Sequence, residues 1–153
     1  MEINRLKKLI ISIFENHKLP KKHSIMCANA ILNAELVGAP SHGVARIYSY
    51  CNRIKKKVIN PRPKIRIKKI SSSITSIDAN NAVGFVGAEI GINQAIKNAQ
   101  KSGIGLVAVK NSGHYGLSGY YAEKAARKNF VALCFTNAPP AIAPYGSKKT
   151  LFG

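Results

Sequence analysis

The chain has 153 residues, an ordinary apolar share of 46% and a formal net charge of +18. No apolar run approaches the roughly 18 residues that cross a bilayer, so a membrane-spanning protein is not expected. The first apolar run, 9–14, is too short for a signal peptide and no small-residue cleavage site follows it, so we expect a cytoplasmic protein.

The positive charge is spread along the whole chain. Such a charge is typical of nucleic-acid-binding proteins, yet the lysines accompany many Asn and Ile residues, as in coding sequences rich in A and T. No aromatic RNA-binding motif occurs. A basic module that binds nucleic acid or another polyanion is therefore the less favoured interpretation, although the charge would attract small anions in either case.

Three cysteines, Cys27, Cys51 and Cys134, are widely spaced. They form no Cys-x-x-Cys pair, and no histidine lies at metal-ligand spacing from them. We therefore predict small buried hydrophobic residues and no metal site.

Apolar residues at helical spacing predict three helices in the first part of the chain, over 1–14, 22–37 and 43–57. Leu19-Pro20 separates the first two, and Gly38-Ala39-Pro40 ends the second. The prolines in 60–63 predict a linker. We expect a small helical domain over 1–62.

The period of the apolar residues changes after the linker. The predicted elements are a half-buried strand 64–70, a strand 73–79, a helix 83–102, a buried strand 104–110, a helix 117–128 and a buried strand 130–136. This alternation predicts an α/β domain over 63–153 with a mixed, partly parallel sheet. Residues 103–108 match the dinucleotide fingerprint GxGxxA by letter only, because these glycines end a helix and enter a strand.

Two segments follow predicted parallel strands and therefore belong on one rim of the sheet, where open α/β sheets bind ligands. The first, Asn-Ser-Gly-His-Tyr-Gly over 111–116, carries His114, and its backbone N–H groups could face an anion. The second is Asn-Ala-Pro-Pro over 137–140. A tight turn with an ordinary surface histidine explains the first segment equally well.

A histidine and an arginine lie close together in Pro-Ser-His-Gly-Val-Ala-Arg over 40–46. Ser41 is a candidate N-cap, His42 falls in the first turn, and Arg46 follows four residues later on the same face. Such a pair suits oxidation of a 2-hydroxy acid: the guanidinium holds the carboxylate, and the imidazole takes the hydroxyl proton as hydride leaves the same carbon. The spacing alone favours the alternative, a capped helix with a solvated His/Arg pair.

Together these segments resemble the type II malate/L-lactate dehydrogenase family, which includes sulfolactate and ureidoglycolate dehydrogenases and diketogulonate reductases. The matching segments are 38–46 with its SHGxxR signature, 78–84, 111–116, 136–140 and 144–146, and they occur in the family's order. The resemblance covers nearly the whole chain. It implies a small helical domain packed on an α/β domain with a fold unlike the ordinary Rossmann fold, and a homodimer with its site between domains and subunits.

The resemblance also implies functional roles. The protein would be an oxidoreductase that transfers hydride between NAD or NADP and a small 2-hydroxy or 2-keto acid. His42 would be the proton donor and acceptor, and Arg46 would clamp the substrate. His114 matches a second histidine proposed as catalytic in some members. The implied cofactor-binding residues are Ser41, His114, Thr136, Asn137 and Ala138. The residues leave open the substrate and the choice between NAD and NADP, and we favour His42 over His114 for proton transfer because Arg46 is near it.

Family members are longer and continue into a Gly-Thr-Asn-Pro segment, so we expect this chain to be an N-terminal fragment that needs a missing C-terminal half. The sheet would then be incomplete and would expose a strand edge and apolar surface. An inactive, degenerate fragment is the alternative to the enzyme.

Overall fold

The computed structural model describes residues 2–152. Met1, where the first predicted helix begins, and Gly153, where the predicted α/β domain ends, lie outside the described residues. The elements are α1 (Ile3–Asn16), α2 (Lys21–Leu36), the 3-10 turns η1 (Pro40–His42) and η2 (Val44–Arg46), α3 (Ile47–Lys55), β1 (Arg66–Lys69), β2 (Ile74–Ala82), α4 (Gly84–Ser102), β3 (Leu106–Ser112) and α5 (Ser118–Ala126).

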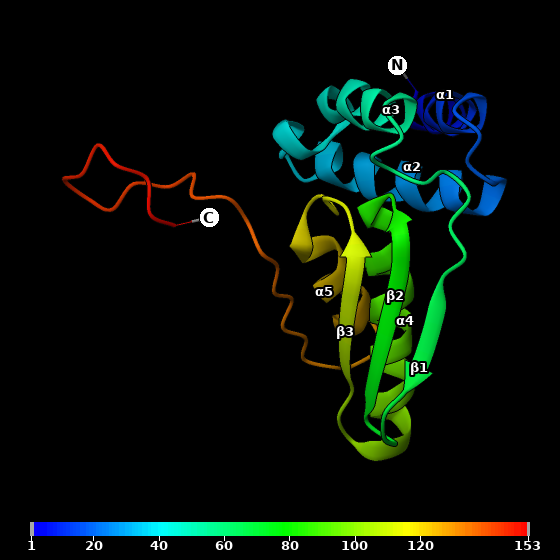
Figure 1. Cartoon of the computed structure of the whole chain (residues 1–153), viewed down its shortest axis with the longest axis vertical. Coiled ribbons are helices and arrows are strands. Elements are labelled where there is room, and N and C mark those ends of the chain that lie inside the picture. Colours follow the sequence, from blue (N-terminus) through cyan, green and yellow to red (C-terminus); the bar gives the residue numbers. More distant parts are fainter. Residues whose placement is uncertain (1, 153) are drawn as a thin grey trace.

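The helices form two groups around a small sheet (Figure 1). Helices α1, α2 and α3 make a layer across one end of the sheet, α4 lies against one of its faces, and α5 packs against α4 and α2. This arrangement confirms the predicted fold class, a small helical part packed on α/β structure. Within residues 2–152, no helix combines the length and apolarity needed to cross a membrane.

The sheet is mixed, with strand order β1-β2-β3. β1 runs antiparallel to β2, and β2 runs parallel to β3 with α4 as the crossover between them. The carboxyl ends of β2 and β3 both point toward the helical layer (Figure 1). The loops that follow these strands are therefore placed beneath α2 and α3.

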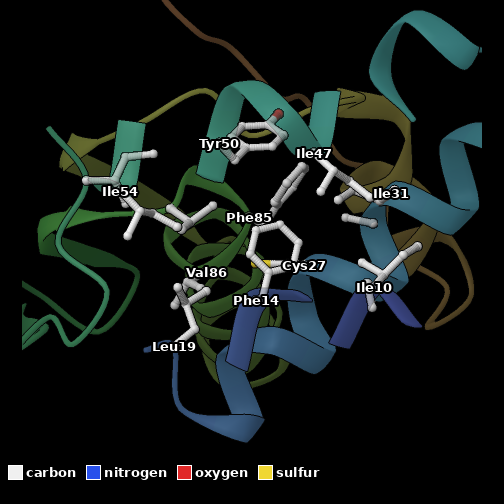
Figure 2. Packing of buried hydrophobic residues seen from close by; sticks show 14 of the residues in the cluster. Ile10, Phe14, Leu19, Cys27, Ile31, Ile47, Tyr50, Ile54, Phe85 and Val86 are labelled. Carbon is white, nitrogen blue, oxygen red and sulfur yellow. The ribbon is translucent and has the colours of Figure 1, made fainter. Parts of the chain in front are cut away.

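One hydrophobic core joins the helical layer to the α/β part. Its central side chains include Phe14 from α1, Cys27 and Ile31 from α2, Tyr50 from α3 and Phe85 from α4 (Figure 2). Because this core is continuous, the division of the chain into domains at residues 62 and 63 stays a proposal. Cys27 and Cys51 are free and buried, as predicted, and Cys134 is free and half-buried.

The sequence signals for helix ends are confirmed. Pro20 precedes α2, and the chain leaves α2 through Gly38 in the left-handed region at φ 74°. Gly103 has the same φ and donates its N–H to the Ala99 carbonyl at 2.8 Å. The glycine of the apparent fingerprint is thus a helix C-cap, a position that suits glycine because no Cβ crowds the backbone there.

The strands are more exposed than the sequence predicts. All four residues of β1 are exposed, although a half-buried strand was expected, and β3 is mostly exposed rather than buried. Val107 and Val109 of β3 face Gly91 of α4, so helices cover that face, whereas no described element covers the other. β3 is also an edge strand, since β2 is its only neighbour within residues 2–152.

The predicted buried strand over 130–136 is wrong for this structure. The segment is extended but pairs with no strand in the described part of the chain, and Val131, Leu133 and Phe135 are 97%, 79% and 86% exposed. Apolar alternation marks a strand only where a neighbour accepts its backbone hydrogen bonds. Here the chain leaves α5 and runs away from the body (Figure 1). The exposed edge and apolar surface expected of an incomplete sheet are present.

The core can be tested on one turn of α1. Ile10 is fully buried, whereas its neighbour Leu9 is 48% exposed. We expect Ile10→Ala to lower the free energy of unfolding by about 2–5 kcal/mol, because it leaves a cavity, and Leu9→Ala to lower it by less than about 1 kcal/mol. Urea unfolding followed by circular dichroism measures both. Equal losses in the two variants would contradict the burial of α1 described here.

Candidate active site

The 40–46 segment forms two successive 3-10 turns, η1 and η2, joined at Gly43, and not the start of one α-helix. The expectation that Ser41 caps this helix is also wrong, since its side chain bonds no backbone N–H at a helix start. The Ser41 hydroxyl instead lies 3.1 Å from Nδ1 of His42. The Arg46 Nε donates to the Ser41 carbonyl at 2.7 Å, so Ser41, His42 and Arg46 are held together as one unit.

Glu35, near the end of α2, fixes this unit to the helical layer. Its Oε1 accepts the backbone N–H of Val44 at 2.6 Å, so the carboxylate caps the second turn. A side chain at Gly43 would overlap the Glu35 carboxylate. Glycine between the two turns therefore allows Glu35 to approach. The Glu35 carboxylate, and not the Ser41 hydroxyl, caps a turn in this segment.

The loop after β3 brings the second histidine to the first. The His42 and His114 rings are stacked, with centroids 5.7 Å apart and an angle of 23° between their planes. This contact joins η1 in the helical layer to the carboxyl end of a parallel strand, the rim where the sequence predicts a ligand site. The structure thus brings together Ser41, His42, Arg46 and His114.

Tyr50 supports His114 from α3. Its hydroxyl lies 2.7 Å from Nδ1 of His114, and its ring packs edge-on against Phe85 with centroids 4.9 Å apart (Figure 2). Nδ1 also accepts the Gly116 N–H at 3.4 Å. Neither histidine makes a hydrogen bond through Nε2 within residues 2–152.

The surroundings of His114 disfavour its protonation. Desolvation lowers the pKa of His114 first, and the nearby positive charges of Arg46 and Arg53 and the His42 imidazole lower it further. His114 nevertheless keeps exposed surface. The site therefore presents a neutral imidazole beside a fixed guanidinium, which suits recognition of an anion next to an exchangeable proton.

The rim continues from β3 to β2. Asp78 accepts the Asn111 side-chain amide at 2.9 Å and the Asn80 N–H at 3.0 Å, and these bonds lower its pKa, the Asn111 bond most. Asn80 and Asn81 have positive φ and lie where the β2–β3 register shifts. β2 thus continues to Ala82 through a bulge, beyond the predicted end at Ala79.

Gly84, the first residue of α4, sets the position of the His114 loop. A Cβ on Gly84 would overlap the carbonyl groups of Gly113 and His114. The loop also donates the Gly113 N–H to the Ala82 carbonyl at 3.3 Å. The close approach of two backbones therefore requires glycine here.

Three predicted cofactor residues stand apart from this cluster. Thr136, Asn137 and Ala138 are exposed and belong to the extended segment that runs away from the body (Figure 1). Thr136 makes a hydrogen bond only to the neighbouring Asn137 carbonyl, at 3.3 Å. The structure does not bring these residues to the histidines. The sequence predicted that their segment lies on the same sheet rim as His114, and in the structure it does not.

Sequence reasoning missed two residues of the cluster, Glu35 and Tyr50. Tyr50 is buried, and a buried tyrosine needs a hydrogen-bond partner for its hydroxyl. Its place four residues after Arg46 was the available signal. Glu35 is one of only six acidic residues in the chain and lies shortly before the 40–46 segment.

Fold and site together define an α/β protein whose helical layer covers the carboxyl ends of parallel strands and holds two histidines and an arginine there. The chain belongs to the malate/L-lactate dehydrogenase family, whose model matches residues 1–153. It is 36% identical to the L-sulfolactate dehydrogenase of Methanocaldococcus jannaschii over 147 residues, which are 96% of this chain and 43% of that enzyme. The solved structure of sulfolactate dehydrogenase from that organism superimposes with a TM-score of 0.89 at 32% identity, covering 100% of this chain and 44% of that one.

Two further relatives also match nearly all of this chain but less than half of their own length. The malate dehydrogenase of Pyrococcus horikoshii is 34% identical over 150 residues, 98% of this chain and 42% of that enzyme. The ureidoglycolate dehydrogenase (NAD(+)) of Escherichia coli strain K12 is 31% identical over 155 residues, 100% of this chain and 44% of that enzyme. The chain therefore spans less than half the length of these relatives.

The backbone contact at Gly84 predicts that an added methyl group lowers stability at this glycine but not at a glycine with open space around it. We expect Gly84→Ala to lower the free energy of unfolding by about 1–3 kcal/mol, because the methyl group forces the His114 loop away. Gly119→Ala, on α5 with open space around it, should be neutral or should stabilise by up to about 1 kcal/mol. Chemical denaturation measures both, and a harmless Gly84→Ala would show that the loop does not rest on α4.

The lowered pKa of His114 predicts a pH effect on stability. Because the folded protein binds fewer protons at this group than the unfolded chain, stability should fall as pH drops below the unfolded pKa of about 6.5. The pKa of His23 is lowered as well, by burial and then by Lys22, so it adds to the same trend. Urea midpoints at pH 7.5 and 5.0 should differ less in His114→Gln than in the native chain. An unchanged difference would contradict the desolvation of His114.

Proposed function

We propose that the chain forms the N-terminal part of an oxidoreductase that transfers hydride between a nicotinamide cofactor and a small 2-hydroxy or 2-keto acid. The observation that carries the proposal is the meeting of His42 and Arg46 with His114 at the carboxyl end of β3. Family membership and the printed names of the relatives, which include malate and sulfolactate dehydrogenases, support the same reaction class.

Arg46 is the proposed substrate clamp. Its Nε is bonded to the Ser41 carbonyl, which fixes the plane of the guanidinium and leaves the two Nη groups for a carboxylate. Paired N–H groups match the two oxygens of a carboxylate, so such a clamp would set the orientation of a 2-hydroxy acid. The reacting carbon, next to that carboxylate, would then lie near the histidines.

His42 is the proposed proton donor and acceptor. It lies in the same bonded unit as Arg46, and its Nε2 makes no hydrogen bond within residues 2–152. In the oxidative direction its imidazole would take the hydroxyl proton of the substrate, and in the reductive direction the imidazolium would return a proton to the keto oxygen.

NAD or NADP is the proposed cofactor, and when bound it would accept or supply the hydride. The stacked imidazoles of half-buried His42 and exposed His114 offer one wall for a flat ring, with Ser41 and His114 as the contacting residues of the described cluster. Thr136, Asn137 and Ala138 would complete the wall only if the extended segment folds onto the rim. The chain spans 43% of its sulfolactate dehydrogenase relative, so further contacts are proposed to come from the length it does not share. A cytoplasmic homodimer completes the proposal.

An inactive fragment is the second candidate. Val131, Leu133 and Phe135 are exposed, and β3 has one edge without a partner strand within residues 2–152. Both features favour the inactive fragment, because exposed apolar surface and an open sheet edge promote association in place of a single stable state.

Turnover decides between the two candidates. The chain is assayed alone and fused to the remaining C-terminal part of the M. jannaschii sulfolactate dehydrogenase, with NADH or NADPH and a panel of 2-keto acids. If the proposal holds, the fused protein oxidises the cofactor, and His42→Asn lowers kcat by about 100-fold or more with little change in cofactor affinity.

His23→Gln, remote from the cluster, is the matched control and should keep full turnover. Full activity in His42→Asn would transfer the proton role away from His42, and a folded fusion without turnover would support the inactive fragment.

A further inference from the structure

Within residues 2–152, the Tyr50 hydroxyl makes its one side-chain hydrogen bond to His114. The Tyr50 side chain is only 3% exposed, and its ring is held edge-on by Phe85. The hydroxyl lies 2.7 Å from Nδ1 of His114, a partner 64 residues away in sequence. Since the ring cannot swing without opening the core, the phenol is a fixed partner of this nitrogen.

A second contact indicates which ring nitrogen of His114 carries the proton. The backbone N–H of Gly116 points at the same Nδ1 atom at 3.4 Å. A backbone N–H can only donate, so it is compatible with Nδ1 as a lone-pair acceptor and is repelled by a protonated Nδ1. The tyrosine hydroxyl, which can take either role, must then donate as well.

We propose that Tyr50 is a positioning residue that, together with the Gly116 N–H, holds His114 as the neutral imidazole protonated at Nε2. The assignment of this tautomer rests on the two contacts at Nδ1. Its meaning for catalysis rests on the proposed function.

The charges around the ring agree with a neutral imidazole. Arg46 and Arg53 are the cations facing His114, the His42 ring is stacked beside it, and all three lower its pKa after desolvation. Burial raises the pKa of the Tyr50 phenol, which keeps its proton available as a donor. No acidic group contributes to the pKa of His114.

The two histidines consequently differ in what they can do. In His114 the lone pair of Nδ1 already accepts hydrogen bonds from Tyr50 and Gly116, and Nε2 carries a proton. His114 therefore has no free basic nitrogen that could take a substrate proton. It can donate a hydrogen bond from Nε2 to the oxygen on the reacting carbon. At Nδ1 of His42 the partner is the Ser41 hydroxyl, which can donate or accept, so His42 can gain and lose a proton without losing that bond.

This contrast divides the reaction between the rings. His42 transfers the proton, and His114 orients and polarises the substrate oxygen with a hydrogen bond that does not change its own protonation. Tyr50 acts through His114, by keeping the proton of its neutral ring on Nε2.

Nuclear magnetic resonance of the free chain tests the tautomer directly. In protein labelled with 15N at histidine, long-range 1H–15N spectra distinguish protonated from unprotonated ring nitrogens, and His114→Asn identifies the His114 signals. At pH 7.5 we expect an unprotonated Nδ1 and a protonated Nε2. Tyr50→Phe keeps the packed ring and removes the donor, so the single-tautomer pattern should be lost and the titration midpoint of His114 should rise.

Tyr48→Phe is the matched control, since Tyr48 lies on the same helix and is 80% exposed. It should leave the His114 spectrum unchanged. A native His114 protonated at Nδ1, or a Tyr50→Phe spectrum equal to the native one, would overturn the proposal. Because no turnover is involved, failure of the proposed reaction would leave the tautomer result standing, and the reverse would also hold.

Discussion

The packing of Tyr50 between Phe85 and the His114 imidazole is the contact on which the site depends. Phe85 belongs to the helix that crosses between the parallel strands, and Tyr50 to the helical layer, so this edge-on contact sets how the two parts meet. The same continuous core that buries Phe14 and Ile31 holds Tyr50 and Phe85 in place. The distance between His42 and His114 is thus a property of core packing across the layers.

Local signals predicted the elements well. Helical spacing predicted three helices and the crossover helix, and proline and glycine marked helix ends. These two residues act locally, because proline lacks a backbone N–H and glycine tolerates positive φ. Burial of the strands was not predictable in the same way. The apolar residues of 104–110 and 130–136 indicate strands covered on both faces. Whether a strand is covered depends on neighbouring strands and helices, and a local sequence pattern does not say whether these are present.

At the site, residue types were predictable but their geometry was not. Spacing placed His42 and Arg46 together, and the rule for parallel strands placed His114 at the rim, yet the turn between the first two is shaped by the Glu35 carboxylate from α2. Glu35 reaches Val44 only because the intervening residue is glycine. Neither this contact, across nine residues, nor that of Tyr50 with His114, across 64 residues, follows a periodic sequence signal.

The extended course of residues 130–136 has a consequence for synthesis on the ribosome. Every element of the compact body lies before Lys128, so this body can form while later residues are still emerging. The growing chain would then display an open sheet edge, followed by an extended apolar segment. Chaperones recognise such unsatisfied surfaces, and slow elongation beyond α5 would lengthen the time for which they are accessible.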